Sequence, residues 1–274
     1  MGSNYWGSLG LGGNDHQSEP QVIPELCHQN IQRFLTAHQL VLAINDRNFQ
    51  KDESDSRVVI KTLAKLTAEL DNSLKVNSEY VVKCMGSWVD STTYYIQMEL
   101  CSDSLQNILR LKPQVFGRQP GESMNSIEFY ISRQIFKEIL ECVQYLHELN
   151  PQIIHRDLKP DNILVARDVK NGRFLKLCDF GLSTVHDRDF YTMTGTQSGA
   201  PEYQAPEVTS GRYDHRIDIY SLFKIGEKLF DFNLNDNTPQ SYSSDNEELN
   251  KCVIKLREVL VSMALYPNWE DRPE

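Results

Sequence analysis

The sequence predicts an α+β fold of two parts, in which a small antiparallel sheet with one helix precedes a larger, mainly helical part. Short runs rich in β-branched residues alternate with turns between Phe34 and Leu100, which is typical of a sheet. After Leu100 the pattern is mostly helical, and residues 126–148 carry one long apolar stripe at helical spacing. A chain of 274 residues has enough volume to bury a core without disulfide bonds.

The first part is predicted to contain short strands and one helix. Apolar and β-branched runs bounded by turn residues predict the strands Leu40–Asn45, Arg57–Lys61, Tyr80–Lys83 and Thr93–Leu100. Leucines at helical spacing between the second and third runs predict one amphipathic helix: Leu63, Leu66, Leu70 and Leu74.

The second part is predicted to be built around the helix at residues 126–148. Its apolar stripe recurs every four positions through Ile127, Ile131, Ile135, Ile139 and Val143, widened by Phe136, Leu140 and Leu146. We expect this stripe to form the buried face of the helix. Two segments rich in Gly, Pro, Ser, Asn and Asp are predicted to be surface loops: Val115–Asn125 and Phe232–Glu247.

The composition excludes several classes of protein. The longest apolar runs fall far short of the roughly 20 residues that a membrane span needs. Lys and Arg number 28 against 38 Asp and Glu, and the net charge of −10 argues against nucleic acid as a direct partner. Residues 1–20 lack the order of a signal peptide, and residues 1–30 are predicted to be a flexible leader.

The six cysteines are scattered along the chain and include no C-x-x-C pair. Neither a zinc ribbon nor a thioredoxin-type redox site is therefore predicted. The cysteines are expected to be reduced thiols in a cytosolic or nuclear setting, and we predict a cytoplasmic protein.

The strongest motif is a loop rich in groups that suit phosphoryl transfer. It is the run Ile154-His155-Arg156-Asp157-Leu158-Lys159-Pro160-Asp161-Asn162-Ile163-Leu164, which Asp179-Phe180-Gly181 follows along the chain. A transferring phosphoryl group is densely anionic, so its catalysis depends on positioning and on charge neutralisation. The two motifs resemble the catalytic loop and the metal-binding loop of the protein kinases.

This resemblance implies a bilobal protein-kinase fold with ATP and Mg²⁺ as cofactors. It implies that Asp157 orients a substrate hydroxyl and accepts its proton, while Lys159 offers a cation to the moving phosphoryl group. Asn162 and Asp179 would supply the oxygen ligands that magnesium prefers. Lys159 also favours serine or threonine over tyrosine as the acceptor, because tyrosine kinases usually carry a different sequence there.

The resemblance also assigns residues to the nucleotide. Val58-Val59-Ile60-Lys61 resembles the V-A-I-K of the third strand, so Lys61 would bind the α and β phosphates and Val59 would lie over the adenine ring. Glu69 would be the helix partner of Lys61. The other residues assigned to the nucleotide are Met98 as gatekeeper, Glu99 and Cys101 through their backbone, and Leu164.

Further landmarks place one kinase domain at residues 31–274, with a small lobe at about 31–100 and a large lobe at about 101–274. Ala205-Pro206-Glu207 resembles the A-P-E motif, Asp218 stands at the start of the central helix, and Arg272 is the expected partner of Glu207. The final helix of the family does not follow Arg272, so the domain is expected to be truncated at that helix.

Softer motifs resemble the kinases that phosphorylate the alpha subunit of eukaryotic translation initiation factor 2. They are Tyr80-Val81-Val82, Ser87-Trp88-Val89, Tyr95 to Cys101, and Asp271-Arg272-Pro273-Glu274. That resemblance implies this subunit as protein substrate and a homodimer formed through the small lobe. A Ser/Thr kinase with another substrate is the open alternative, because Asp231–Asp245 is unlike the substrate-docking helix of that subfamily.

Four departures from the kinase pattern fall where nucleotide and substrate are held. The segment Thr36–Ala43, where a glycine-rich loop is expected, contains no glycine, which would weaken a phosphate cradle. Val59 replaces an alanine, and only eight residues separate Lys61 from Glu69. Gly199-Ala200 replaces the usual G-T. The open alternative to an active kinase is a pseudokinase-like interaction or allosteric module with weak or no phosphoryl transfer.

Regulation by phosphorylation is also predicted. Arg156 is a cation beside Asp157 that would favour an anionic partner, and the segment Gly181–Ala205 is rich in hydroxyls. A phosphate on Thr194 or Thr196 would add about −1.5 to −2 charge and order that segment against Arg156.

Overall fold

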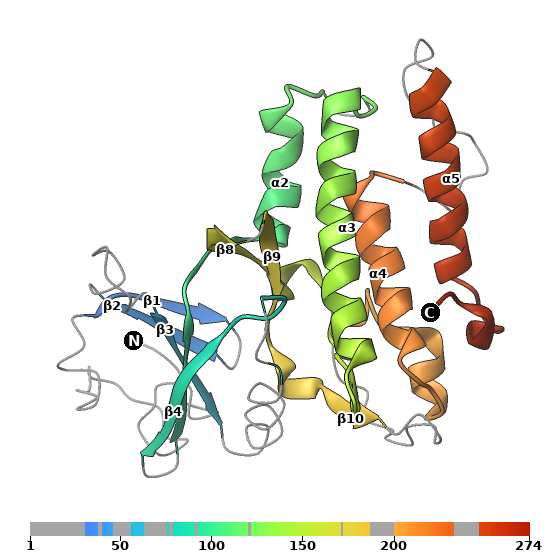
Figure 1. The fold of residues 1–274 in the computed structure, drawn as a ribbon. Coiled ribbons are helices and arrows are strands. Elements are labelled where there is room, and N and C mark those ends of the chain that lie inside the picture. The colour runs from blue at the N-terminus through green and yellow to red at the C-terminus, as the bar shows by residue number, and fades with distance from the viewer. Residues whose placement is uncertain are drawn as a thin grey trace. The chain divides into compact units, whose positions relative to one another are not determined.

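The computed structural model describes residues 31–37, 40–45, 56–62, 76, 79–90, 93–119, 122–170, 172–186, 200–232 and 247–274. The chain divides into two compact units, Met1–Cys101 and Ser102–Glu274 (Figure 1). Within the described residues, the first unit is a sheet of strands, and the second is mainly helical with short strands between its helices.

The first unit contains a five-stranded antiparallel sheet in the order β1-β2-β3-β5-β4. Its strands are β1 (Ile31–Ala37), β2 (Leu40–Asn45), β3 (Ser56–Thr62), β4 (Cys84–Asp90) and β5 (Thr93–Glu99). Three of the predicted strands correspond to β2, β3 and β5, where β-branched and aromatic residues are dense. The helix predicted at Leu63–Leu74 lies outside the described residues.

The strand predicted at Tyr80–Lys83 is wrong. Val81 makes only an isolated bridge there, and the strand β4 begins at Cys84. Val81 and Val82 are 1% and 5% exposed, so two consecutive side chains are buried, whereas a strand turns successive side chains to opposite faces. A short apolar run does not by itself distinguish a strand from other buried backbone.

The described α-helices of the second unit are α2 (Leu105–Val115), α3 (Ser126–Glu148), α4 (Arg216–Leu229) and α5 (Glu247–Met263). Its described strands are β7 (Gln152–Ile154), β8 (Ile163–Lys170), β9 (Arg173–Leu177) and β10 (Thr184–His186), together with β6 (Cys101–Ser104), whose first residue is the last of the first unit. They form a β6-β8-β9 sheet and a β7-β10 pair. None of the helices that the structure describes combines the length and apolar character needed to cross a membrane.

Helix α3 has the predicted bounds, but its buried face matches the predicted stripe only from Phe136 onward. Ile127 is 67% exposed and Ile131 is 45% exposed. At 3.6 residues per turn, each four-residue step overshoots a full turn by about 40°, so the predicted isoleucine series begins in solvent and reaches the core only at Ile139. The face that is buried alternates steps of three and four: Phe129, Ser132, Phe136, Ile139, Val143 and Leu146.

Helix α4 lies between α3 and α5 and packs against both (Figure 1). The ring of Phe230, just after α4, lies 5.7 Å from the rings of both Phe129 and Phe136 of α3. On α4 itself, a Cβ at Gly226 would lie 2.5 Å from Leu260 of α5 and 3.3 Å from Phe136. Glycine therefore permits the close approach that holds the three helices together.

Candidate active site

The predicted catalytic loop lies between two strands of the second unit. Strand β7 is buried, with Ile153 and Ile154 at 2% and 0% exposure, and it pairs with β10. Leu158, 1% exposed, anchors the loop in the core, and Pro160–Asn162 form one turn of 3-10 helix before β8. Buried apolar residues thus fix the loop, while the polar residues between them supply its chemistry.

Asp157 is nearly buried and both of its carboxylate oxygens accept hydrogen bonds. Lys159 Nζ donates to Oδ2 at 2.7 Å, and Asn162 Nδ2 donates to the same oxygen at 3.1 Å. The backbone N–H of Ala200 donates to Oδ1 at 3.2 Å. Ala200 thus contributes its amide where the family's threonine would contribute a hydroxyl. The carboxylate is held in one orientation before any substrate arrives.

Asp218 in the first turn of α4 holds the backbone of the catalytic loop. It is 0% exposed, and its two oxygens accept the N–H groups of His155 at 2.8 Å and Arg156 at 2.9 Å. His147 Nε2 of α3 lies 2.9 Å from Oδ2. Burial alone would raise the pKa of Asp218, but the hydrogen bonds and positive charge of its neighbours lower the pKa below its ordinary value. An ionised carboxylate therefore anchors the loop.

Arg156 adopts a left-handed backbone with φ of 68°. That conformation costs a non-glycine residue roughly 1–2 kcal/mol. The surroundings hold it there, because the amide of Arg156 donates to Asp218, the side-chain Nε donates to the carbonyl oxygen of Leu182, and Nη1 donates to the hydroxyl of Tyr213 at 2.9 Å. The residue that precedes Asp157 is thus fixed through both its backbone and its side chain.

The antiparallel ladder of β8 and β9 brings the two predicted metal ligands close together. The amide of Cys178 donates to the carbonyl oxygen of Asn162 at 3.0 Å, and Asp179 is the next residue. Asn162 Nδ2 donates hydrogen bonds to Asp157. The side-chain oxygen of Asn162 therefore lies on the side of the amide away from Asp157. An amide oxygen and a carboxylate are the hard donors that Mg²⁺ prefers, so the residues fit the metal.

His155 and Phe180 link the catalytic loop to the segment that carries Asp179. Their rings lie 5.1 Å apart, and both side chains are buried. His155 Nε2 also lies 3.1 Å from the carbonyl oxygen of Cys178. This packing fixes the distance between the proposed base and the proposed metal ligand.

Val59 and Lys61, which were assigned to the nucleotide, lie on β3. Their partners across the ladder are Ile96 and Tyr94 of β5. Glu69, the expected partner of Lys61, lies outside the described residues.

Met98 and Glu99 lie at the end of β5, and Leu164 lies in β8. Glu99 is held in place by Lys83, whose amide donates to Glu99 Oε1 at 2.9 Å and whose carbonyl accepts the Glu99 amide at 3.0 Å. Cys101 is 4% exposed at the start of β6. Glu99 and Cys101, on either side of Leu100, are therefore both held in place.

The segment that lacks the expected glycines belongs to a β-hairpin. Thr36 pairs with Val41, and Ala37 pairs with Leu40. The backbone thus keeps an antiparallel pair of strands at this position without glycine.

Three contacts of the site were not predicted from the sequence. Asp218 and Tyr213 contact Arg156 of the catalytic loop, and His147 contacts Asp218. His147 offered a signal, because it is a polar residue on the buried face of α3, four residues after Val143. Thr194 and Thr196, predicted to be regulatory, lie outside the described residues.

A family model described as protein kinase domain matches residues 47–270. The chain belongs to the protein kinase family. The match begins after β1 and β2, so the hairpin without glycine lies outside it. As expected of a kinase, Glu207 and Arg272 pair in the core, with N–O distances of 2.5 and 3.0 Å and side chains 2% and 0% exposed.

Curated relatives are also protein kinases. Serine/threonine-protein kinase zyg-8 of Caenorhabditis elegans is 28% identical over 75% of this chain and 26% of the relative. Serine/threonine-protein kinase RAD53 of Saccharomyces cerevisiae is 31% identical over 73% of this chain and 23% of the relative. Calcium-dependent protein kinase 3 of Plasmodium yoelii yoelii is 31% identical over 61% of this chain and 28% of the relative. The kinase chain thus spans less than a third of the length of each of these relatives.

Proposed function

We propose that this chain is an ATP-dependent protein serine/threonine kinase. The observation that carries the proposal is the arrangement around Asp157, which is held by Lys159 and Asn162, with Asp179 brought near Asn162 by the β8-β9 ladder. Phosphoryl transfer needs a carboxylate for the acceptor hydroxyl, a cation for the phosphoryl group and oxygen ligands for the metal. These four residues supply all three.

In this reaction Asp157 orients the substrate hydroxyl and accepts its proton. Lys159, whose ammonium lies 2.7 Å from Asp157 Oδ2, adds positive charge beside the transferring group. Mg²⁺, held by Asn162 and Asp179, would neutralise charge on the phosphate oxygens. Because Asp157 is already fixed by its donors, little reorganisation is needed when the substrate binds.

The nucleotide would be bound by the residues that the family resemblance assigns to it. We propose that Lys61 binds the α and β phosphates with Glu69 as its partner. Val59 would lie over the adenine, Met98 would be the gatekeeper, and the backbone of Glu99 and Cys101 would meet the adenine edge. Leu164 is proposed as a further residue that binds the nucleotide. The alternative of a module without phosphoryl transfer is not favoured, because every residue required for the chemistry is present and the relatives named above are protein kinases.

The alpha subunit of translation initiation factor 2 is the substrate that we propose. This proposal rests only on the sequence motifs at residues 80–82, 87–89, 95–101 and 271–274. The same resemblance supports a homodimer and a role in the regulation of translation under stress, and the scattered cysteines support a cytoplasmic location. Phosphorylation of Thr194 or Thr196 is proposed to control the enzyme through Arg156.

Nucleotide binding can be tested by thermal unfolding with ATP in the presence and absence of Mg²⁺. At about a hundred times the dissociation constant, a ligand adds about 2.7 kcal/mol of stability. We expect ATP with Mg²⁺ to raise the Tm of the wild type, and Asp179→Asn to lose the part that depends on the metal. A wild-type chain with no stabilisation that depends on Mg²⁺ would argue against the kinase proposal.

The substrate can be tested with ATP labelled at the γ-phosphate. We expect the alpha subunit of initiation factor 2 to take up label faster than a generic basic protein at equal concentration. Equal labelling of the two proteins would contradict the substrate proposal and leave the kinase proposal standing.

A further inference from the structure

The hydroxyl of Tyr213 contacts Arg156 of the catalytic loop, although Tyr213 belongs to none of the kinase motifs found in the sequence. We propose that Tyr213 is a positioning residue for Asp157, acting through the guanidinium of Arg156. This inference rests on the proposed kinase function. It assigns a role in the reaction to a tyrosine whose ring is part of the core.

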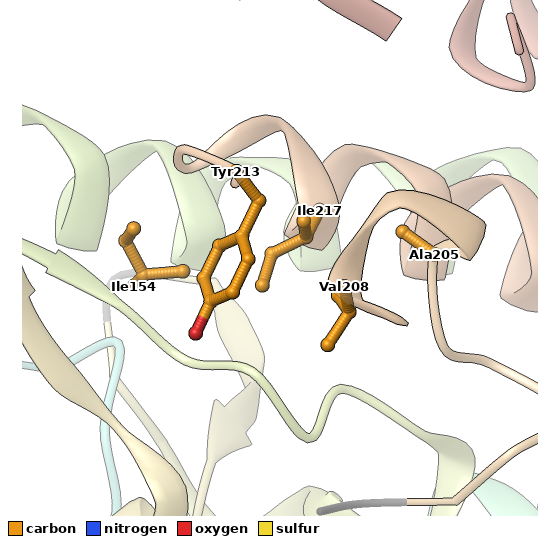
Figure 2. Close-up of a cluster of buried hydrophobic side chains, with 5 residues drawn as sticks. All are labelled: Ile154, Ala205, Val208, Tyr213 and Ile217. Atoms are coloured by element: carbon orange, nitrogen blue, oxygen red, sulfur yellow. The ribbon is translucent and has the colours of Figure 1, made fainter. Parts of the chain in front are cut away.

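The ring of Tyr213 is fixed by a cluster of buried side chains. The residue is 1% exposed and packs with the other members of the cluster: Ile154, Ala205, Val208 and Ile217. Figure 2 shows the ring between Ile154 and Ile217, with its hydroxyl at the end of the ring away from the backbone of Tyr213. A ring held in this way leaves its hydroxyl oxygen little freedom to move.

The hydroxyl oxygen accepts a hydrogen bond from Arg156 Nη1 at 2.9 Å. The same guanidinium donates through Nε to the carbonyl oxygen of Leu182, two residues after Phe180. The guanidinium is therefore held by the tyrosine on one side and by the segment after Asp179 on the other. The hydrogen bond has a charged donor, and such bonds are stronger than those between neutral groups.

This contact bears on the reaction because Arg156 directly precedes Asp157. The backbone of Arg156 is left-handed, with φ of 68°, and such a conformation persists only where the surroundings hold it. Asp218 holds the amide of Arg156, and Tyr213 holds its side chain. Without the hydroxyl, the peptide that orients the Asp157 carboxylate gains freedom, while the nucleotide residues are unaffected.

The test removes only the hydroxyl, with Tyr213→Phe. Tyr220→Phe is the matched control, because Tyr220 packs against the same cluster and its ring remains beneath the Arg272 guanidinium. We expect Tyr213→Phe to lower kcat for phosphate transfer to casein by about tenfold, with KM for ATP changed by less than about twofold. Tyr220→Phe is expected to match the wild type. Equal kcat values for both variants would overturn the proposal.

A double-mutant cycle with Arg156→Met separates positioning from general loss of stability. If the hydroxyl acts through Arg156, Tyr213→Phe has little further effect on kcat or Tm once the guanidinium is absent. Effects that add fully in both measurements would overturn the proposal.

The unfolding part of the cycle does not depend on activity. If the wild type transfers no phosphate, the proposed kinase function fails, and the Tm values alone then decide whether the hydroxyl holds Arg156. Coupled Tm changes would support the contact, and additive Tm changes would reject it.

Discussion

Asp157 is oriented by residues that lie far apart in the sequence. Lys159 and Asn162 belong to its own loop, but Ala200 lies 43 residues further on and Asp218 anchors the loop from α4. The motifs predicted Asp157, Lys159 and Asn162, because these residue types are diagnostic in their order. They did not predict the anchoring contact of Asp218 or that of Tyr213, since an aspartate in the first turn of a helix and a tyrosine just before it have many ordinary uses.

Ala200 offers a direct test of how Asp157 is held. Its amide already donates to Asp157 Oδ1 at 3.2 Å, and a serine would add a hydroxyl donor next to that oxygen and Lys159. We expect Ala200→Ser to raise kcat by about threefold, since a neutral hydrogen bond contributes about 0.5–1.5 kcal/mol.

Ala200→Val is the control, because it adds volume without a donor. Steady-state phosphate transfer to casein measures both variants. If serine gives no higher kcat than valine, the hydroxyl missing at position 200 does not limit catalysis.

His215 makes the stability of the kinase depend on pH. Its ring lies 4.9 Å from that of His147, and burial, together with the charge of His147, lowers the pKa of His215 from 6.5 to about 4. The unfolded chain therefore binds more protons than the folded chain between these two values, so the free energy of unfolding decreases as the pH falls through that window.

We expect the Tm to fall between about pH 7 and about pH 5, and to fall less in His215→Gln, which cannot take up the proton. Thermal unfolding in buffers of equal ionic strength measures both proteins. Parallel Tm curves for wild type and variant would show that another group causes the pH dependence.

Among the elements, α3 shows what the sequence could and could not predict. Its bounds at Ser126–Glu148 followed from apolar periodicity. The structure adds the N-cap residue Asn125, whose side chain accepts the amide of Glu128 at 2.9 Å. Ile127 and Ile131 were assigned wrongly to its buried face, because the isoleucines at four-residue spacing were given more weight than Phe129 and Ser132. Apolar periodicity predicts that a helix is present, but which face of the helix is buried depends on the elements that pack against it.

Two isoleucines of α3 test this orientation with the same substitution. Ile139 is 0% exposed and Ile127 is 67% exposed. We expect Ile139→Ala to lower the free energy of unfolding by about 2–5 kcal/mol through lost burial and a cavity. Ile127→Ala should change it by no more than about 0.5 kcal/mol. Thermal or denaturant unfolding that ranks the two variants the other way would contradict the assigned face.

For the whole molecule, the motifs predicted the family because they spread over most of the chain, from Val58 to Arg272, and the family model matches residues 47–270. The division into two units falls after Cys101. The hairpin of β1 and β2 was only half predicted, because Ile31–Ala37 mixes polar and apolar residues without strict alternation. β1 is a strand because it pairs with β2, and the sequence of β1 alone does not predict that pairing.

The Glu207–Arg272 pair joins segments 65 residues apart and should matter for the stability of the second unit. Both side chains are almost fully buried, so Glu207→Gln would leave the Arg272 charge without its counterion. We expect a loss of about 3–5 kcal/mol in the free energy of unfolding.

The Arg212–Glu270 pair provides the control, because its side chains are 59% and 58% exposed and 3.9 Å apart. Arg212→Ala should cost no more than about 1 kcal/mol. Similar losses from Glu207→Gln and Arg212→Ala would show that burial of the first pair is not what makes it important.

The most direct test of the central claim is transfer of the labelled γ-phosphate of ATP to casein and to the alpha subunit of initiation factor 2. Asp157→Asn is compared with Asp161→Asn, which changes an exposed acid of the same loop. We expect the wild type and Asp161→Asn to label at least one acceptor, and Asp157→Asn to be slower by about 10²–10⁴-fold. A wild type that labels neither acceptor, or an Asp157→Asn variant that keeps the wild-type rate, would contradict the account.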